Sequence, residues 1–169
     1  MDYEHFMKKA LEQAERALAA GEFPVGCVIV HDQGIVATGA RTGTRGDYPN
    51  EVDHAEMIAL RKLINLKTKI NFKETILFST LEPCLMCFGA LMISGIGKVV
   101  FAYEDALGGG CRCDTQKLPP LYKDRQIEII PKILRNESLR LLKTYFSQSQ
   151  HAYLKDSLLA SYTLSQHLI

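Results

Sequence analysis

Two short motifs place metal-binding side chains near the starts of expected helices. The first is HAE at residues 54–56, and the second is PCLMC at residues 83–87. Cys84 and Cys87 are three positions apart, so they share one face of a helix and can bind one metal ion. Both fall in the first helical turn, where the positive end of the helix stabilises the thiolate that a metal requires. The spacing therefore predicts a metal site that contains both cysteines.

His54 and Glu56 can face one site only if His54 lies at the very start of its helix. In a regular helix, residues two positions apart point about 200° away from each other. Asp53 is the predicted N-cap, which would make His54 the first helical residue. We therefore expect His54 to bind the metal while Glu56 lies beside it.

One histidine and two cysteines leave one of the four tetrahedral positions of a zinc ion open, as in catalytic sites. Two thiolates neutralise the formal charge of zinc, so Glu56 is the candidate base that helps to take a proton from water. Each motif alone has other interpretations, because HxE occurs by chance and CxxC also serves zinc ribbons and redox pairs. A closed structural site could add only Cys27, Cys111 or Cys113, and the sequence has no second CxxC. Together the motifs favour a catalytic zinc.

The rest of the sequence predicts the elements that position these motifs. Apolar residues recur at helical spacing from about residue 2 to residue 20, and residues 25–40 have the pattern of a β-hairpin. Helices are expected from Asp53 and from Pro83, because proline suits the first helical position. The further strands are expected at residues 74–80, 98–103 and 127–130, and the further helices near Glu137–Phe146 and Ala152–Leu164. This order predicts an α/β fold, a three-layer α/β/α sandwich around a five-stranded mixed sheet, in one domain spanning residues 1–169.

The composition argues against a dedicated nucleic-acid binder. The 169 residues include 20 Lys and Arg and 19 Asp and Glu, so the formal net charge is +1. A domain that depends on phosphate contacts is usually far more basic. No apolar run approaches the roughly eighteen residues of a membrane span, and the N-terminus has the pattern of an amphipathic helix and not of a secretory signal. We therefore expect a cytoplasmic protein without membrane contact, whose five cysteines are reduced.

The sequence resembles the zinc-dependent cytidine/deoxycytidylate deaminase superfamily. HAE followed by PCxxC is the signature of these enzymes. Four longer blocks are similar to those of bacterial tRNA adenosine deaminases and of guanine and cytosine deaminases: FPVGCVIV, HAEMIALRK, TLEPCLMCFGALMISGIGKVVFAYED and IEIIPKILRNESLRLLKTYF. The resemblance covers about residues 3–148 and leaves about residues 149–169 as a C-terminal helical extension. It implies a cytidine deaminase-like fold.

The resemblance also implies a hydrolytic deamination with one zinc ion per chain, held by His54, Cys84 and Cys87. Zinc-bound hydroxide would attack the ring carbon that bears the amine. Glu56 would take the proton of the water and pass protons to the ring nitrogen and to the departing ammonia. Members of the family are usually homodimers, so a homodimer is expected by resemblance.

Gly26, Cys27, Arg41 and Pro83 are predicted to contact the substrate. A glycine at position 26 would let the strand backbone approach the base, whereas Cys27 could instead be a small buried hydrophobic residue. Arg41 stands where the family has an asparagine that grips the base or its ribose, and arginine offers donors but no acceptor. It would either bind a phosphate or carboxylate of the substrate or lie solvated at the end of a strand.

Two further segments have no assigned role from the motifs. The glycine-rich stretch Gly108–Asp114 could cradle a phosphate, but it lacks the GKS/T of a P-loop, which favours a mobile loop. The tail from Ser147 contains one lysine and no arginine, unlike the basic final helix of tRNA-editing relatives. An apolar stripe in this tail predicts packing on the core or on a partner; it consists of Leu154, Leu158, Leu159 and Tyr162.

We therefore expect hydrolytic deamination of a small nucleobase or nucleoside, with release of ammonia, in purine or pyrimidine metabolism. The near alternative keeps this chemistry with adenosine in tRNA as the substrate, which the neutral charge, Arg41 and the tail disfavour. The distant alternative is a non-catalytic zinc scaffold, against which the intact Glu56 argues.

Overall fold

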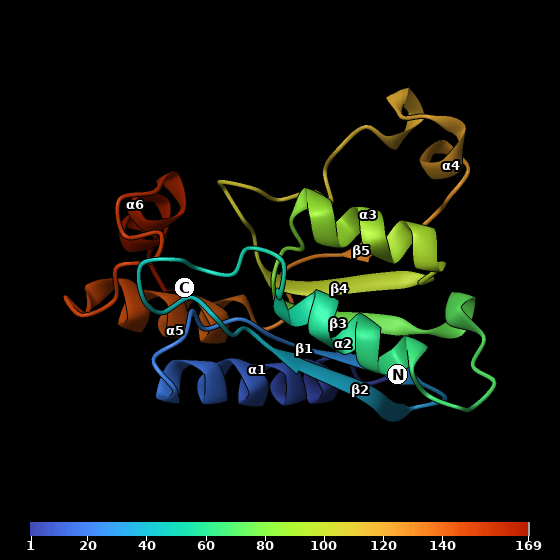
Figure 1. Ribbon diagram of the computed structural model, residues 1–169, viewed down its shortest axis with the longest axis horizontal. Coiled ribbons are helices and arrows are strands. Elements are labelled where there is room, and N and C mark those ends of the chain that lie inside the picture. The colour runs from blue at the N-terminus through green and yellow to red at the C-terminus, as the bar shows by residue number, and fades with distance from the viewer. Residues whose placement is uncertain (169) are drawn as a thin grey trace.

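The computed structural model describes residues 1–168, with a mixed sheet at its centre (Figure 1). Ile169, the last residue of the predicted C-terminal extension, lies outside the described residues. The strands are β1 (Gly26–His31), β2 (Gly34–Ala40), β3 (Ile76–Leu81), β4 (Lys98–Tyr103) and β5 (Glu128–Ile130). The helices are α1 (Tyr3–Ala19), α2 (Ala55–Ile64), α3 (Leu85–Ser94), α4 (Pro120–Lys123), α5 (Arg135–Ser147) and α6 (Leu158–Ser165), with 3-10 turns at Phe72–Glu74 and Thr115–Lys117.

The sheet has the strand order β2-β1-β3-β4-β5. β1 is antiparallel to β2 and β3, whereas β4 is parallel to β3 and β5. Helices α2 and α3 cover one face, and α1 and α5 lie on the other (Figure 1). The predicted α/β sandwich with a five-stranded mixed sheet is therefore confirmed. No helix within residues 1–168 is long and apolar enough to cross a bilayer.

Successive side chains of β1 and β3 point to opposite faces of the sheet, which explains the two layers of helices. Val28 of β1 and Phe78 of β3 pack with Phe6 of α1 in one buried cluster. Ile29 and Leu77, the next or preceding residues of the same strands, belong to the cluster that contains α2. Because successive side chains of a strand point to opposite faces, both faces of β1 and β3 are apolar and both must be covered by helices.

α2 begins one residue later than predicted. The N-cap is His54, with extended backbone angles (φ −64°, ψ 155°), and its carbonyl oxygen accepts the first helical bond from the amide of Ile58 at 3.0 Å. The predicted N-cap, Asp53, is wrong because its carboxylate binds Arg61 and Asn50 instead. His54 nevertheless lies at the start of the helix, as the site requires.

α3 also begins later in the sequence than predicted. Its N-cap is Cys84 (φ −66°, ψ 169°), whose carbonyl oxygen accepts from the amide of Phe88 at 2.8 Å. The prediction that Pro83 is the first helical residue is therefore wrong, and Pro83 lies just before the cap. Both helices that carry the metal-binding motifs thus begin at a predicted ligand.

The C-terminal segment is less helical than predicted. α6 spans Leu158–Ser165, capped by Ser157, whose hydroxyl accepts from the amide of Ala160 at 3.2 Å. The helix expected from Ala152 is wrong for residues 152–157, because Leu154 adopts the left-handed region (φ +57°), which interrupts any helix. The predicted apolar stripe is broken as a result.

Gly39 of β2 lies where α2 approaches the sheet. A Cβ atom there would lie 1.9 Å from the carbonyl oxygen of Ala55, so a side chain would displace the first turn of α2. Gly39→Ala is expected to lower the free energy of unfolding by about 1–3 kcal/mol, measured by urea denaturation. Gly34→Ala is the matched control, because the nearest atom there lies at 3.5 Å. A loss at Gly39 no larger than at Gly34 would contradict this account of the helix position.

Candidate functional site

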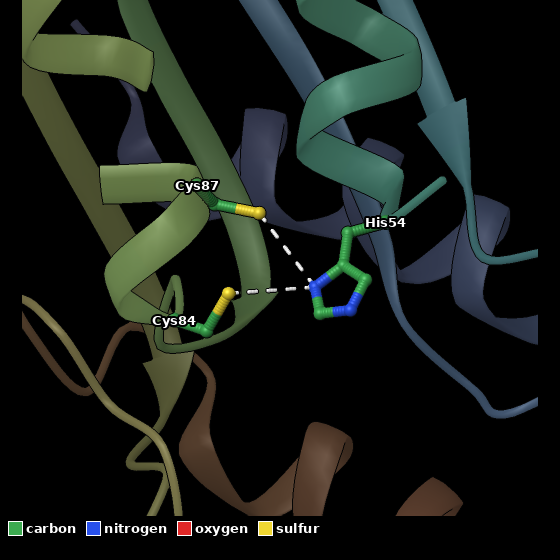
Figure 2. A group of neighbouring side chains, drawn as sticks. All are labelled: His54, Cys84 and Cys87. Atoms are coloured by element: carbon green, nitrogen blue, oxygen red, sulfur yellow. Dashed lines mark hydrogen bonds between the residues drawn. The ribbon is translucent and has the colours of Figure 1, made fainter. Parts of the chain in front are cut away.

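His54, Cys84 and Cys87 come together where α2 and α3 begin. The Nδ1 atom of His54 lies 3.5 Å from the Sγ atom of Cys84 and 3.6 Å from that of Cys87 (Figure 2). The three ligand atoms all lie within 4.8 Å of one another. The structure therefore brings the predicted metal ligands into one group.

The separations in this group fit a zinc ion. Zn–S bonds of about 2.3 Å and Zn–N bonds of about 2.0–2.1 Å at a tetrahedral angle place nitrogen and sulfur about 3.6 Å apart. The two distances from His54 to the thiols agree with this value. Two sulfur donors and one imidazole are also a donor set that zinc prefers. Three protein ligands leave one tetrahedral position for water or substrate.

The side chains around Cys84 favour its thiolate form. Neither His54 nor Cys84 uses its side chain to cap its helix, so both side chains are free to turn toward the metal. A hydrogen bond from the Cys87 thiol lowers the pKa of Cys84 to about 4, against the effect of burial and with a further contribution from His54. The same hydrogen bond raises the pKa of Cys87. Zinc requires both thiols as thiolates, so the remaining proton is released when the metal binds.

Glu56 is buried beside the ligands, with 3% of its surface exposed. Its Oε1 atom accepts a hydrogen bond from the Ser79 hydroxyl at 3.1 Å, and its Oε2 atom lies 3.7 Å from the Cys87 Sγ atom. Burial raises the pKa of the Glu56 carboxyl. Ser79 was not predicted from the sequence, because it is buried on β3 and belongs to no motif. Its hydroxyl holds one carboxylate oxygen of Glu56 in place.

A cavity of about 210 Å³ opens beside this group. This volume is below the roughly 300–1,000 Å³ of pockets for drug-sized ligands, so the cavity suits one heterocyclic base. The lining is largely apolar with several carboxylates: Phe23, Val25, Arg41, Glu51, His54, Ala55, Glu56, Leu81, Glu82, Cys84, Asp105, Leu107, Gly108, Tyr153, Leu154 and Leu159.

Glu82 and Asp105 are lining residues that the sequence analysis did not select. Glu82 follows β3 directly and Asp105 comes two residues after β4, and the two strands are parallel. Functional side chains often lie at the carboxyl ends of parallel strands, so the positions of Glu82 and Asp105 shortly after two predicted strands could have identified them. The Oε2 atom of Glu82 accepts from the Asp105 amide at 3.2 Å, and burial raises the pKa of Glu82.

Within residues 1–168, Arg41 is the one predicted substrate contact that lines the cavity. Its side chain is 2% exposed, so the alternative of a solvated strand end is wrong. The glycine at position 26 is required by α1, because a Cβ there would lie 2.3 Å from the amide nitrogen of Ala14. Cys27 is fully buried in the core cluster that includes α2, and burial raises the pKa of its thiol. Pro83 precedes Cys84 in the sequence and is not among the described residues that line the cavity.

The glycine-rich stretch packs against the start of α3. Gly109 forms an isolated β-bridge with Cys84, and the amide of Gly110 donates to the carbonyl oxygen of Pro83 at 2.9 Å. A Cβ atom at position 110 would lie 2.7 Å from the Cα atom of Leu85. Gly109 and Gly110 therefore permit a close backbone contact with the segment that carries the predicted ligand Cys84.

A half-buried carboxylate, Glu104, ties α6 to the sheet. Glu104 accepts hydrogen bonds from the Nε atom of Arg135 at 2.9 Å and from the Tyr162 hydroxyl at 2.8 Å. Burial raises the pKa of Glu104, but these hydrogen bonds outweigh it and lower the pKa to about 2, from an ordinary value of 4.5. A carboxyl group with a lowered pKa stabilises the folded protein at pH values above its pKa in the unfolded chain. This stabilisation is lost as the pH falls toward its pKa in the folded protein.

Glu104→Gln is expected to lower the free energy of unfolding by about 2 kcal/mol at neutral pH. Its difference from the wild-type protein should narrow between about pH 4.5 and pH 2, where the wild-type carboxylate takes up its proton. Urea denaturation of both proteins across this range measures the effect. A difference that stays constant with pH would show that Glu104 contributes through packing and not through its charge.

Comparisons with known proteins agree with this site. Residues 1–103 match the family model described as the cytidine and deoxycytidylate deaminase zinc-binding region. The chain is 30% identical over 146 residues to a tRNA-specific adenosine deaminase of Streptococcus pyogenes serotype M18, covering 86% of this chain and 91% of that protein. It is 31% identical over 155 residues to tRNA-specific adenosine deaminase 2 of Xenopus tropicalis, covering 87% and 90% respectively.

Solved structures of deaminases are also similar to this chain. A structure from a study of A-to-I editing at the wobble position of transfer RNA has a TM-score of 0.69 and 26% identity, covering 81% of this chain and 98% of that one. Guanine deaminase from Bacillus subtilis has a TM-score of 0.55 and 34% identity, covering 62% of this chain and 66% of that one.

Proposed function

Because the chain belongs to the cytidine and deoxycytidylate deaminase zinc-binding family, and is therefore a zinc-binding hydrolase of carbon–nitrogen bonds, we propose that it deaminates adenosine presented by tRNA. This substrate was the alternative in the sequence analysis. The comparisons support it better than the small free substrate, since the curated relatives described above are tRNA-specific adenosine deaminases. The observation that carries the proposal is the Glu56 carboxylate, held by Ser79 beside the three ligands and facing a cavity for one base.

In this proposal, His54, Cys84 and Cys87 hold the zinc ion. Zinc, when bound, supplies a Lewis acid that makes water a nucleophile near neutral pH. Glu56 takes the proton of the attacking water and delivers protons to the ring nitrogen and to the departing amine. The reaction consumes one water, converts the adenine base to hypoxanthine and releases ammonia. Ser79 keeps one oxygen of Glu56 hydrogen-bonded, so the other is directed toward the reacting atoms.

The size of the cavity supports a single base as the part of the substrate that is enclosed. An enzyme that acts on a nucleobase in RNA must hold that base outside its stack. A cavity of about 210 Å³ next to the ligands suits such a base. The apolar lining suits the faces of the heterocycle, and the carboxylates suit its exocyclic amine.

A second candidate is a free purine base or nucleoside. It is supported by three lining residues from the C-terminal segment, Tyr153, Leu154 and Leu159, which close the cavity on one side. The net charge of +1 also offers little general attraction to RNA.

Ammonia release and product mass should be measured with tRNA, adenosine, adenine and guanine. We expect inosine in tRNA as the product, and a salt-sensitive gel shift with tRNA. Turnover of a free purine without turnover of tRNA would establish the second candidate. No turnover of any of these substrates by zinc-loaded protein would refute the proposal.

We also propose that the chain is one domain with a C-terminal extension, acts in the cytoplasm and forms a homodimer. Exposed apolar side chains on and near the metal-binding helix α3 support a dimer through this face; they are Leu85, Met86, Ile93 and Leu107. Light scattering should give twice the mass of one chain. A monomeric mass at micromolar concentration would contradict this part of the proposal.

A further inference from the structure

Arg41 is buried at one side of the cavity, and both of its Nη atoms already have partners. Its Nη1 atom donates to the carbonyl oxygens of Thr42 at 2.7 Å and Asp53 at 3.0 Å. Its Nη2 atom donates to the Tyr153 hydroxyl at 3.3 Å and lies 3.6 Å from the Oε2 atom of Glu51. A guanidinium with these partners has little left to offer an anionic substrate.

Tyr153 connects this arginine to the C-terminal segment. Its hydroxyl donates to the Oε2 atom of Glu51 at 2.7 Å. Its ring packs edge-on against Phe23, with centroids 5.6 Å apart, and the guanidinium carbon of Arg41 lies 5.5 Å from its centroid. We call Arg41, Glu51 and Tyr153 the latch, because they join residues 41–51 to the C-terminal segment.

Tyr153 of the latch also lines the cavity, beside two leucines of the C-terminal segment. Tyr153, Leu154 and Leu159 line it together, and we call them the C-terminal wall. Leu159 is 1% exposed and packs in the core. Leu154 has a left-handed backbone (φ +57°), which a branched side chain adopts only when its surroundings impose it. The position of the wall therefore depends on contacts at both of its ends.

We propose that Arg41 is a positioning residue, whose latch holds the C-terminal wall against the substrate base and thereby sets the affinity of the cavity. The proposal rests on the deaminase function proposed above. It adds that the latch and the C-terminal wall determine the KM for the substrate. With the charge of Arg41 engaged, the acidic residues that line the cavity are Glu51, Glu56, Glu82 and Asp105. Such a cavity favours a neutral, amine-bearing base and disfavours a phosphate group placed inside it.

Tyr153→Phe is the sharpest test, because it removes both hydrogen bonds of the hydroxyl and keeps the ring. For the substrate that the wild-type protein deaminates among tRNA, adenosine and adenine, KM should rise about three- to ten-fold. The value of kcat should stay within about two-fold, because the wall makes no contact that is specific to the transition state. Amide hydrogen exchange of residues 148–157 should accelerate, and the zinc content should not change.

Tyr122→Phe is the matched control. It removes a tyrosine hydroxyl from α4, away from the C-terminal segment, and Tyr122 is not among the described residues that line the cavity. Its KM should equal that of the wild-type protein. Arg41→Asn should raise KM at least as much as Tyr153→Phe, and Arg41→Lys, which keeps the charge, should fall between Arg41→Asn and the wild-type protein.

Three results would overturn the proposal. The first is unchanged KM and unchanged exchange in Tyr153→Phe. The second is an equal rise of KM in Tyr122→Phe. The third is a preference of the wild-type protein for adenosine 5′-monophosphate over adenosine that Arg41→Asn abolishes, because Arg41 would then bind the phosphate directly. If the wild-type protein deaminates none of these substrates, the proposed function fails, and the exchange measurement still decides whether the latch exists.

Discussion

Glu56→Gln is expected to lower kcat by about 10²- to 10⁴-fold while the protein keeps its zinc. The amide has nearly the shape of the carboxylate and can still accept a hydrogen bond from Ser79, which donates to Oε1 at 3.1 Å in the wild-type protein. It cannot, however, take up and release the proton that deamination requires. Ammonia release under saturating substrate measures the loss, and metal analysis should give about one zinc per chain.

Glu15→Gln is the matched control for this experiment, because Glu15 is an exposed carboxylate on α1. It should leave kcat unchanged within about two-fold. If Glu56→Gln retained the activity of the wild-type protein, another group would have to move the proton, and the assignment of Glu56 would be wrong. If it lost zinc as well as activity, the carboxylate would support the metal site and its role in proton transfer would be unproved.

Cys87→Ser is expected to abolish both zinc binding and activity. Cys87 is fully buried and its Sγ atom lies 3.6 Å from the Nδ1 atom of His54. Changes at groups that only support metal ligands typically weaken binding about 10- to 100-fold, so loss of a ligand should weaken zinc binding by more than about 100-fold. Competition with a chromogenic chelator measures the affinity, and thermal unfolding should show a lower Tm because the metal joins two helices.

Cys113→Ser controls for the loss of a thiol as such. Cys113 is exposed in the loop that follows β4, and its replacement should change neither zinc affinity nor Tm. Full zinc occupancy in Cys87→Ser would contradict the assigned ligand set. An equal loss in Cys113→Ser would show that the measured effect is not specific to the site.

The main elements could be predicted from the sequence, because alternation and helical spacing are local signals. The errors at the starts of α2 and α3 have a common cause. Capping preferences favour Asp53 and the rule for proline favours Pro83, whereas the structure places His54 and Cys84 at the caps. Both residues must turn their side chains toward one point between two helices, and this tertiary requirement outweighs the local preference.

The candidate ligands and Glu56 could be selected from motif spacing, but the walls of the cavity could not. Tyr153 and Arg41 are 112 positions apart, and no periodicity in the sequence relates them. Leu154 was assigned to a helix because its spacing from Leu158 is helical, and a left-handed backbone at a leucine has no sequence signal. Glu82 and Asp105 could have been predicted, because each closely follows a strand that was predicted from the sequence.

The C-terminal wall has a practical consequence for protein engineering. Its three residues come from one short segment near the end of the chain, whereas the proposed ligands and Glu56 come from residues 54–87. A combinatorial library confined to Tyr153, Leu154 and Leu159 would therefore vary the space around the proposed substrate base while the proposed ligands and Glu56 stay intact. Selection from such a library is a direct route to variants that deaminate bulkier or differently substituted heterocycles.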